Sequence, residues 1–63
     1  MIFSIIIPVF NEEKTILEVL RKVNNIQFSK LQKEIIVVDD GSNDNTSNIL
    51  SQNKNLYSHL YSN

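Results

Sequence analysis

An uninterrupted apolar run that ends in two carboxylates constrains the fold of this chain more than any other segment. Residues 35–38 read IIVV, Asp39 and Asp40 follow directly, and the only glycine, Gly41, comes next. Such a run is typical of a buried strand in a parallel sheet, where both faces are covered. Open α/β sheets bind their ligands at the carboxyl ends of such strands. The segment therefore predicts a parallel sheet that presents acidic side chains to a ligand.

The first third of the chain predicts a strand followed by a helix. Residues 3–9 are almost wholly apolar, and the consecutive Ile5, Ile6 and Ile7 favour a strand covered on both faces. Pro8 lies near the end of the run, where a missing N–H is tolerated. Asn11 is the expected N-cap of a helix that reaches Asn24 or Asn25, because apolar side chains recur there at helical spacing. A loop is expected over residues 26–33, with Phe28 and Leu31 against the core.

The remainder predicts a second strand, a helix and a third strand. The second strand is expected over residues 34–39 and a turn over residues 41–43. Asp44 is the expected cap and Thr46 an ordinary first-turn residue of a helix over residues 45–52, with Ile49 and Leu50 buried. A polar break and a strand over residues 56–61 follow. This β-α-β-α-β order favours a parallel sheet with right-handed crossovers, and a sheet this small leaves an apolar face uncovered.

Composition excludes several classes of site and partner. The chain has 63 residues, a net charge of −1, no cysteine and one histidine. It therefore holds at most one small domain and has neither a disulfide nor a cysteine-based zinc site. No basic cluster predicts a nucleic-acid partner, and no apolar run approaches the roughly 20 residues of a membrane span. A cytoplasmic location is the default expectation.

Two acids and one aromatic side chain are the candidates for ligand contact. Successive strand residues point to opposite sides, so Asp39 and Asp40 are expected to differ in role. One carboxylate can accept an N–H from a nucleobase, while the other can accept backbone amides of the turn. Phe10 and Glu12 follow the first strand at the matching level, where the ring could stack on a base. Their alternative roles are core packing and helix-dipole complementation.

The two strand ends together resemble a known family. SIIIPVFNEE at residues 4–13 and EIIVVDDGSNDNT at residues 34–46 are similar to the inverting GT-A-fold glycosyltransferases of family 2. The nearest group is the dolichyl- or polyprenyl-phosphate sugar synthases. The resemblance implies that residues 1–63 are the N-terminal portion of a Rossmann-like domain that binds a nucleotide sugar. The full enzyme would transfer the sugar to an acceptor.

The resemblance also assigns roles to particular residues. By motif, the residues implied to bind the nucleotide are Pro8, Phe10, Glu12, Val38 and Asp40. The residues implied to hold the turn or cap the second helix are Asp39, Gly41, Ser42 and Asp44. Phe10 replaces the tyrosine that is commoner in the family, so stacking is kept and a hydroxyl contact is lost.

Other parts of the family pattern lie beyond Asn63. The metal-binding D-x-D motif and the catalytic base come later in the family, so no catalytic or metal-binding residue is expected here. Mg²⁺ or Mn²⁺ is implied for the full-length enzyme only. The implied partners are a nucleotide-diphosphate sugar, a lipid-phosphate acceptor at the cytoplasmic face of a membrane, and the rest of the enzyme or a complementing chain. The chain alone is expected to be inactive.

Two alternatives stay open from the sequence. A receiver-like phospho-acceptor domain also places an acid pair after an apolar strand, although there the pair ends the first strand. A small interaction module would instead use an exposed sheet face to bind a partner.

Overall fold

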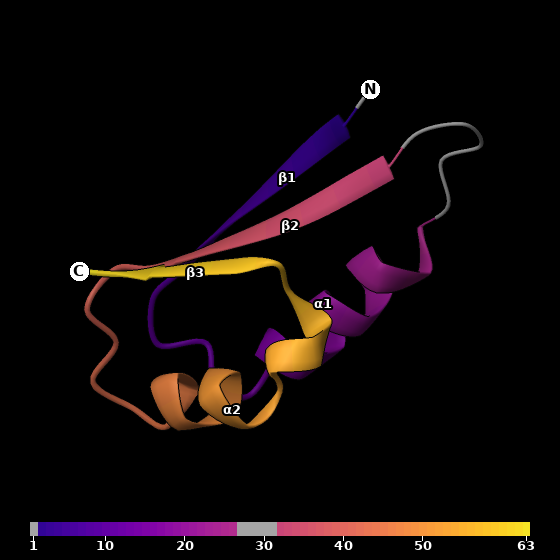
Figure 1. Ribbon diagram of the computed structural model, residues 1–63. Helices are drawn as coiled ribbons and strands as arrows, with labels where there is room; N and C mark the ends of the chain where they lie inside the picture. The colour runs from indigo at the N-terminus through magenta and orange to yellow at the C-terminus, as the bar shows by residue number, and fades with distance from the viewer. Residues whose placement is uncertain (1, 27–31) are drawn as a thin grey trace.

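The fold alternates parallel strands with helices. The computed structural model describes residues 2–26 and 32–63. Its elements in chain order are β1 (Ile2–Val9), α1 (Ile16–Asn25), β2 (Gln32–Asp39), α2 (Thr46–Gln52), the 3-10 turn η1 (Lys54–Leu56) and β3 (His59–Ser62). Figure 1 shows the strands side by side above the helices. The predicted α/β order with a parallel sheet is confirmed.

The three strands form one parallel sheet in the order β1-β2-β3. Val9 pairs with Asp39, and the Val9 carbonyl accepts the Asp40 N–H at 2.8 Å. In a parallel ladder, alternate residues bond to opposite neighbours, so the backbone polar groups of Pro8 point away from β2. Pro8 therefore removes no hydrogen bond from the ladder, and this explains why proline is tolerated in β1.

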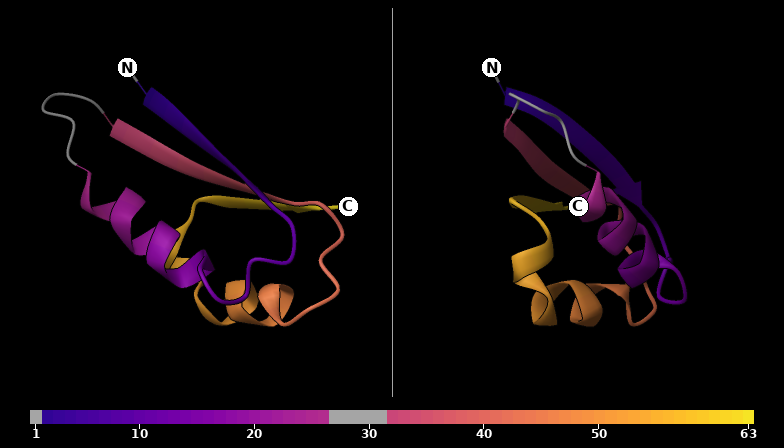
Figure 2. Two further views of the ribbon diagram at one scale, coloured as in Figure 1. Left: turned by 180° about the vertical axis from the view of Figure 1, so that it is seen from behind. Right: turned by 90° about the vertical axis from the view of Figure 1, so that its right-hand side faces the viewer.

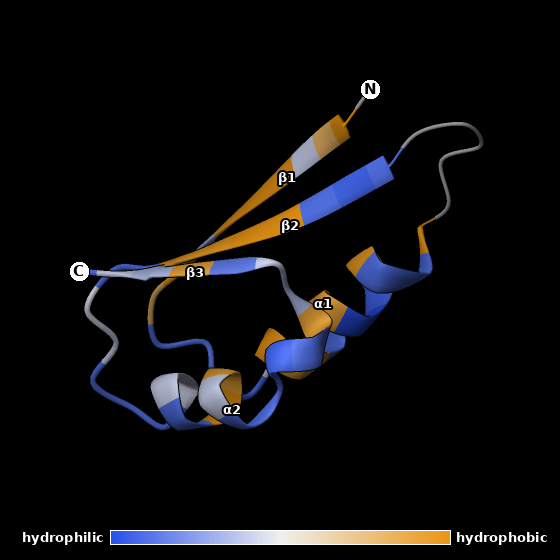
Figure 3. Cartoon of the chain, viewed as in Figure 1, coloured by the Kyte–Doolittle hydropathy of each residue, from blue (hydrophilic) through white to orange (hydrophobic). Residues whose placement is uncertain are grey.

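Both helices cover the same face of the sheet. In the two views of Figure 2, α1 and α2 lie on one side of the strands and the other side is bare. The core lies between these layers and consists of Val9, Ile16, Leu20, Ile35, Val37 and Leu50. The expectation that the first strand is covered on both faces is wrong for this chain, because the side chain of Ile6 is 65% exposed. The predicted uncovered apolar face is confirmed, and Figure 3 shows the apolar stretch of β1 that contributes to it.

The first helix begins later than predicted. Its N-cap position is Thr15, four residues after Asn11, and it ends at Asn25 as expected. The carbonyl of Glu12 accepts the N–H groups of Thr15 at 3.0 Å and Ile16 at 2.8 Å, so a tight turn precedes the helix. Asn11 has a left-handed backbone with φ of 51°, which a helix N-cap does not have. The prediction that Asn11 caps the helix is therefore wrong.

The ammonium group of Lys33 closes the carboxyl end of α1. Its Nζ donates to the carbonyls of Val23 at 3.0 Å, Asn24 at 2.6 Å and Ile26 at 2.6 Å. The Val23 carbonyl also accepts the Ile26 N–H at 3.2 Å, and all three carbonyls lie at the negative end of the helix dipole, where a cation is favoured. Lys33 belongs to β2, which begins two residues before the predicted start at residue 34. The predicted positions of Phe28 and Leu31 lie outside the described residues.

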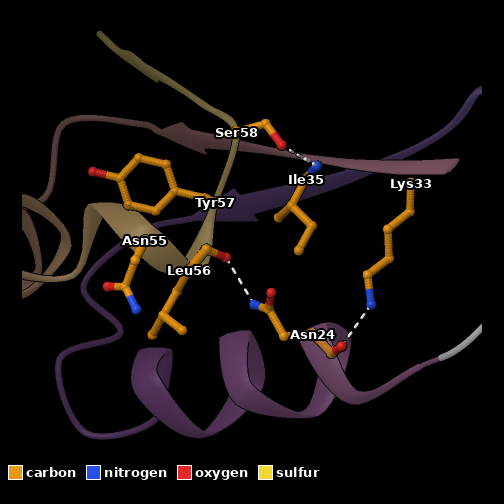
Figure 4. A pocket seen from close by; sticks show the side chains of 7 residues that line it. All are labelled: Asn24, Lys33, Ile35, Asn55, Leu56, Tyr57 and Ser58. Atoms are coloured by element: carbon orange, nitrogen blue, oxygen red, sulfur yellow. Dashed lines mark hydrogen bonds between the residues drawn. The ribbon is translucent and has the colours of Figure 1, made fainter.

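A small pocket of about 120 Å³ lies beside this closure. Figure 4 shows the Asn24 side chain donating to the Leu56 carbonyl and the Ile35 amide donating to Ser58 Oγ. These hydrogen bonds join α1, η1 and β2 around the pocket. It lies toward the amino end of β2, away from the acids.

The second helix and the third strand are shifted slightly from their predicted bounds. The N-cap position of α2 is Asn45, one residue after Asp44. Leu50 is fully buried as predicted, whereas Ile49 is half-buried. The predicted polar break contains η1, so β3 begins at His59, three residues after the expected start.

Candidate functional site

The loops that follow β1 and β2 meet at the carboxyl edge of the sheet. Three consecutive amides of the first loop donate to side chains of the second loop. The bonds run from Asn11 N to Ser42 Oγ at 2.9 Å, from Glu12 N to Thr46 Oγ1 at 2.9 Å, and from Glu13 N to Asp44 Oδ2 at 3.3 Å. Backbone groups that could not join the sheet or the helix are satisfied in this way.

The side chain of Asn11 completes the connection in the opposite direction. Its Oδ1 accepts the backbone N–H groups of Asn43 at 2.7 Å and Asp44 at 3.3 Å. Asparagine tolerates the left-handed conformation observed here better than most residues. We refer to residues 11–13 and 42–46, joined by these five hydrogen bonds, as the clasp.

Asp39, the last residue of β2, holds the second loop of the clasp through its carboxylate. The residue is only 3% exposed, and its carboxylate accepts Ser42 N at 3.2 Å, Ser42 Oγ at 2.5 Å and Ser47 Oγ at 2.9 Å. Burial by itself raises the pKa of the Asp39 carboxyl, but the hydrogen bonds from Ser42 and Ser47 outweigh it and leave the pKa below its usual value. Asp39 is thus ionised and directed at the turn, where its carboxylate accepts three hydrogen bonds.

Asp44 and Thr46 form the other end of the clasp. Asp44 Oδ1 accepts Thr46 N at 2.9 Å and also the Thr46 hydroxyl. Desolvation raises the pKa of Asp44, but the bonds from Thr46 and Glu13 lower it by more, so the pKa lies below its usual value. Thr46 is fully buried, and its hydroxyl accepts the Glu12 amide and donates to the Asp44 carboxylate. Asp44 thus serves the first turn of α2 although it does not occupy the N-cap.

The clasp leaves three of the candidate contact residues open to solvent. The ring of Phe10 is 53% exposed, and Glu12 and Asp40 are also exposed. The Glu12 carboxylate accepts Thr15 Oγ1 at 3.0 Å, and the Asp40 carboxylate accepts Asn63 Nδ2 at 3.3 Å. These carboxylates lie on solvent-facing loops and keep further acceptor capacity.

Gly41 gives the second loop its direction. Its φ of +73° lies in the left-handed region that glycine adopts at no steric cost. The loop can therefore turn immediately after Asp40 and return toward Asn11.

Pro8 and Val38 are neighbours in the sheet. They pair in the β1–β2 register, and Val38 pairs in turn with Tyr61 of β3. Since Val9, Val37 and Asp39 are buried, strand alternation places Pro8 and Val38 on the face without helices. Tyr61 is 59% exposed in the same row, a position that sequence analysis does not single out.

A hollow of about 220 Å³ lies along β1 and α1. Its lining includes Ile7, Pro8, Val9, Glu12, Ile16 and Val19. Of the five predicted nucleotide-binding residues it therefore contains Pro8 and Glu12 only. Phe10, Val38 and Asp40 do not line it, so the candidate site is an open edge of the sheet rather than an enclosed pocket.

The described residues contain neither a cluster of metal-ligating side chains nor a helix able to span a bilayer. Within residues 2–26 and 32–63, histidine and acidic side chains do not gather in groups of three or more that could hold a metal ion. In the same ranges, neither α-helix has the length and apolar character required to cross a bilayer. A divalent metal therefore does not fit the residues present, and we derive no chemical step through one.

The sequence profile of the family described as Glycosyl transferase family 2 matches residues 4–61, which include both loops of the clasp. This chain belongs to glycosyl transferase family 2. The profile extends through α2 and β3, beyond the two motifs on which the resemblance was based. A receiver-like domain does not account for this match, and the acid pair of this family 2 chain ends its second strand rather than its first.

Several curated relatives of this family 2 chain have glycosyltransferase names and are much longer than it. It is 42% identical over 55 residues to the poly(ribitol-phosphate) beta-N-acetylglucosaminyltransferase TarS of Staphylococcus aureus, covering 87% of the chain and 10% of the relative. It is 48% identical over 48 residues to the undecaprenyl-phosphate 4-deoxy-4-formamido-L-arabinose transferase of Pseudomonas fluorescens, covering 75% and 14%. It is 40% identical over 57 residues to the glycosyltransferase AglE of Haloferax volcanii, covering 90% and 19%. The chain thus spans less than a fifth of the length of each relative. No solved structure matches it significantly.

Sequence analysis missed the residues that join the two loops. It treated Asn11 as a helix cap and Thr46 as an ordinary first-turn residue, whereas both bridge the loops. A usable signal was the position of both motifs at the ends of adjacent parallel strands, because neighbouring strand ends bring their loops together.

Proposed function

We propose that this chain forms the nucleotide-binding front part of a glycosyltransferase that moves a sugar from a nucleotide-diphosphate donor to an acceptor. The clasp is the observation that carries the proposal, because it holds the loop bearing Phe10 and Glu12 beside the loop that follows Asp40. The exposed Phe10 ring is suited to stack on a base. The exposed Asp40 carboxylate is suited to accept a base N–H, which both uracil and guanine offer.

The neighbouring residues have supporting roles in this proposal. Pro8 and Val38 supply an apolar surface beside the nucleoside, and Glu12 borders the hollow along β1. Asp39, Gly41, Ser42 and Asp44 shape the loop and do not touch the nucleotide.

The acceptor we propose is a polyprenyl phosphate, at the cytoplasmic face of a membrane. The relative from Pseudomonas fluorescens, whose printed name is that of an undecaprenyl-phosphate transferase, supports this choice. Residues 1–63 then form the N-terminal portion of the transferase domain. The metal ligands for Mg²⁺ or Mn²⁺ and the catalytic base come from the remainder of the enzyme or from a complementing chain.

A nuclear magnetic resonance titration of the 63-residue chain with UDP and GDP tests nucleotide binding. We expect amide shifts at residues 10–12 and 38–41, and about tenfold weaker binding in Asp40→Ala, because a hydrogen bond to a charged group is lost. Glu18→Ala is the matched control, since this exposed carboxylate lies on α1 and pairs only with Lys22.

Two results would count against the proposal. An unchanged spectrum at millimolar UDP and GDP would remove nucleotide binding from this chain, and concentration-dependent self-association without nucleotide would then favour the interaction-module alternative. Sugar transfer to polyprenyl phosphate by the isolated chain would contradict the assignment of the catalytic residues to another segment.

A further inference from the structure

Asn11 differs from its neighbours Phe10 and Glu12 in that its side chain faces the protein. Its Oδ1 accepts the amides of Asn43 and Asp44, and its own amide donates to Ser42 Oγ. These three bonds make up the majority of the five bonds in the clasp. A single residue between two candidate contact residues therefore controls how the second loop lies against the first.

The geometry points to Asn11 as a positioning residue that fixes the Phe10 loop against the Asp40 loop before the nucleotide binds. This inference rests on the proposed function of the site and adds a residue to which neither the motif nor the family match assigns a role. The physical basis is preorganisation, because a site held in its bound geometry loses less conformational freedom when the ligand arrives.

Several groups in the clasp make the effect specific to the Asn11 side chain. The hydrogen bond from Ser42 Oγ to the Asp39 carboxylate holds the start of the second loop. The Asn11 side chain takes no part in this bond. Among the hydrogen bonds of the described residues, the Asn43 amide has the Asn11 oxygen as its partner. The Asp44 amide donates to the same oxygen and also interacts with its own carboxylate. Removing that oxygen therefore frees the middle of the second loop and leaves its anchor in place.

The left-handed backbone of Asn11 dictates the choice of substitution. Asn11→Ala would add strain at φ of 51°, whereas Asn11→Gly tolerates this φ and removes the side-chain acceptor while adding backbone flexibility. Asn11→Asp keeps an acceptor oxygen and tolerates the same conformation. Asn43→Gly is the matched control, because it introduces the same flexibility into the clasp but retains the amide that donates to Asn11.

The first experiment measures the affinity of each variant of the 63-residue chain for uridine and guanosine by nuclear magnetic resonance. These probes are uncharged, so the added charge of Asn11→Asp does not act on a phosphate. We expect about tenfold weaker binding for Asn11→Gly, because two hydrogen bonds that order the loop are lost. Binding within about twofold of wild type is expected for Asn11→Asp and Asn43→Gly. Wild-type affinity in Asn11→Gly, or no recovery in Asn11→Asp, would overturn the inference.

A second measurement is independent of any ligand. Hydrogen exchange should show reduced protection of the Asn43 and Asp44 amides in Asn11→Gly, with unchanged protection in the core of β2. If wild type binds neither the nucleosides nor UDP and GDP, the proposed function fails for this chain, and this exchange measurement decides the positioning role alone. Equal protection of both amides in wild type and Asn11→Gly would reject that role.

Discussion

Thr46 provides the sharpest test of the energetics of the clasp. The residue is fully buried, its Oγ1 accepts the Glu12 amide at 2.9 Å, and its hydroxyl donates to Asp44. Thr46→Val keeps the shape and the β-branch but removes both bonds. Thr46→Ser keeps the hydroxyl and removes one buried methyl group. The pair therefore separates hydrogen bonding from packing at a single position.

The two losses have different expected sizes. Thr46→Val leaves the Glu12 amide without its partner, at about 1–2 kcal/mol, and Asp44 without one donor, at about 0.5–1 kcal/mol, for a total of about 2–3 kcal/mol. Thr46→Ser loses burial of one methyl group, about 1 kcal/mol with its small cavity. We therefore expect the valine variant to be the less stable of the two, which reverses the order that hydrophobicity alone predicts.

Urea unfolding followed by far-UV circular dichroism measures these free energies directly. Thermal unfolding should agree, since about 1 kcal/mol corresponds to a shift of about 4–8 °C in the midpoint for a domain of this size. The valine variant is thus expected to melt about 10–20 °C below wild type. A valine variant at least as stable as the serine variant would refute the claim that the Thr46 hydroxyl connects the loops.

Two further predictions concern charged groups. Lys33→Met should lower the free energy of unfolding by about 1–3 kcal/mol in the same urea assay, because three carbonyls at the end of α1 lose an ammonium donor. The control Lys22→Met removes an exposed ion pair with Glu18 and should change the free energy of unfolding by less than about 0.5 kcal/mol. The folded-state pKa of Asp39 is lowered, so its stabilising contribution is complete above its unfolded pKa of about 3.9 and is lost as pH falls through the folded value. Wild type should therefore lose stability below about pH 4, and a pH series in which Asp39→Asn showed the same loss would reject this cause.

Several elements could be predicted from local sequence because their signals are local. The apolar run before Asp39 and the helical spacing after residue 15 identified β2 and α1, since burial and periodicity are written directly in the chain. The bounds were less certain where two local signals competed. Asn11 is a residue type that often caps helices, but here its side-chain oxygen accepts two amides of the β2–α2 loop instead of capping α1.

The candidate site shows the same division. The sequence indicated which residue types lie at the strand ends, and the family match supports the class of enzyme. The sequence did not indicate that Thr46 would accept a hydrogen bond from the Glu12 amide. The two residues lie 34 positions apart and meet only when β1 and β2 pair.

The sequence alone therefore determined the α/β class, the order of the elements and the edge of the sheet where polar groups gather. These properties follow from hydrophobic periodicity and from the position of the turn residues, which any local window contains. Only the tertiary structure decided that Asn11 joins the two loops instead of capping α1, and that Thr46 accepts the Glu12 amide. Those outcomes depend on which backbone amides find partners across the sheet, and a buried amide must be satisfied by whatever group the fold brings to it.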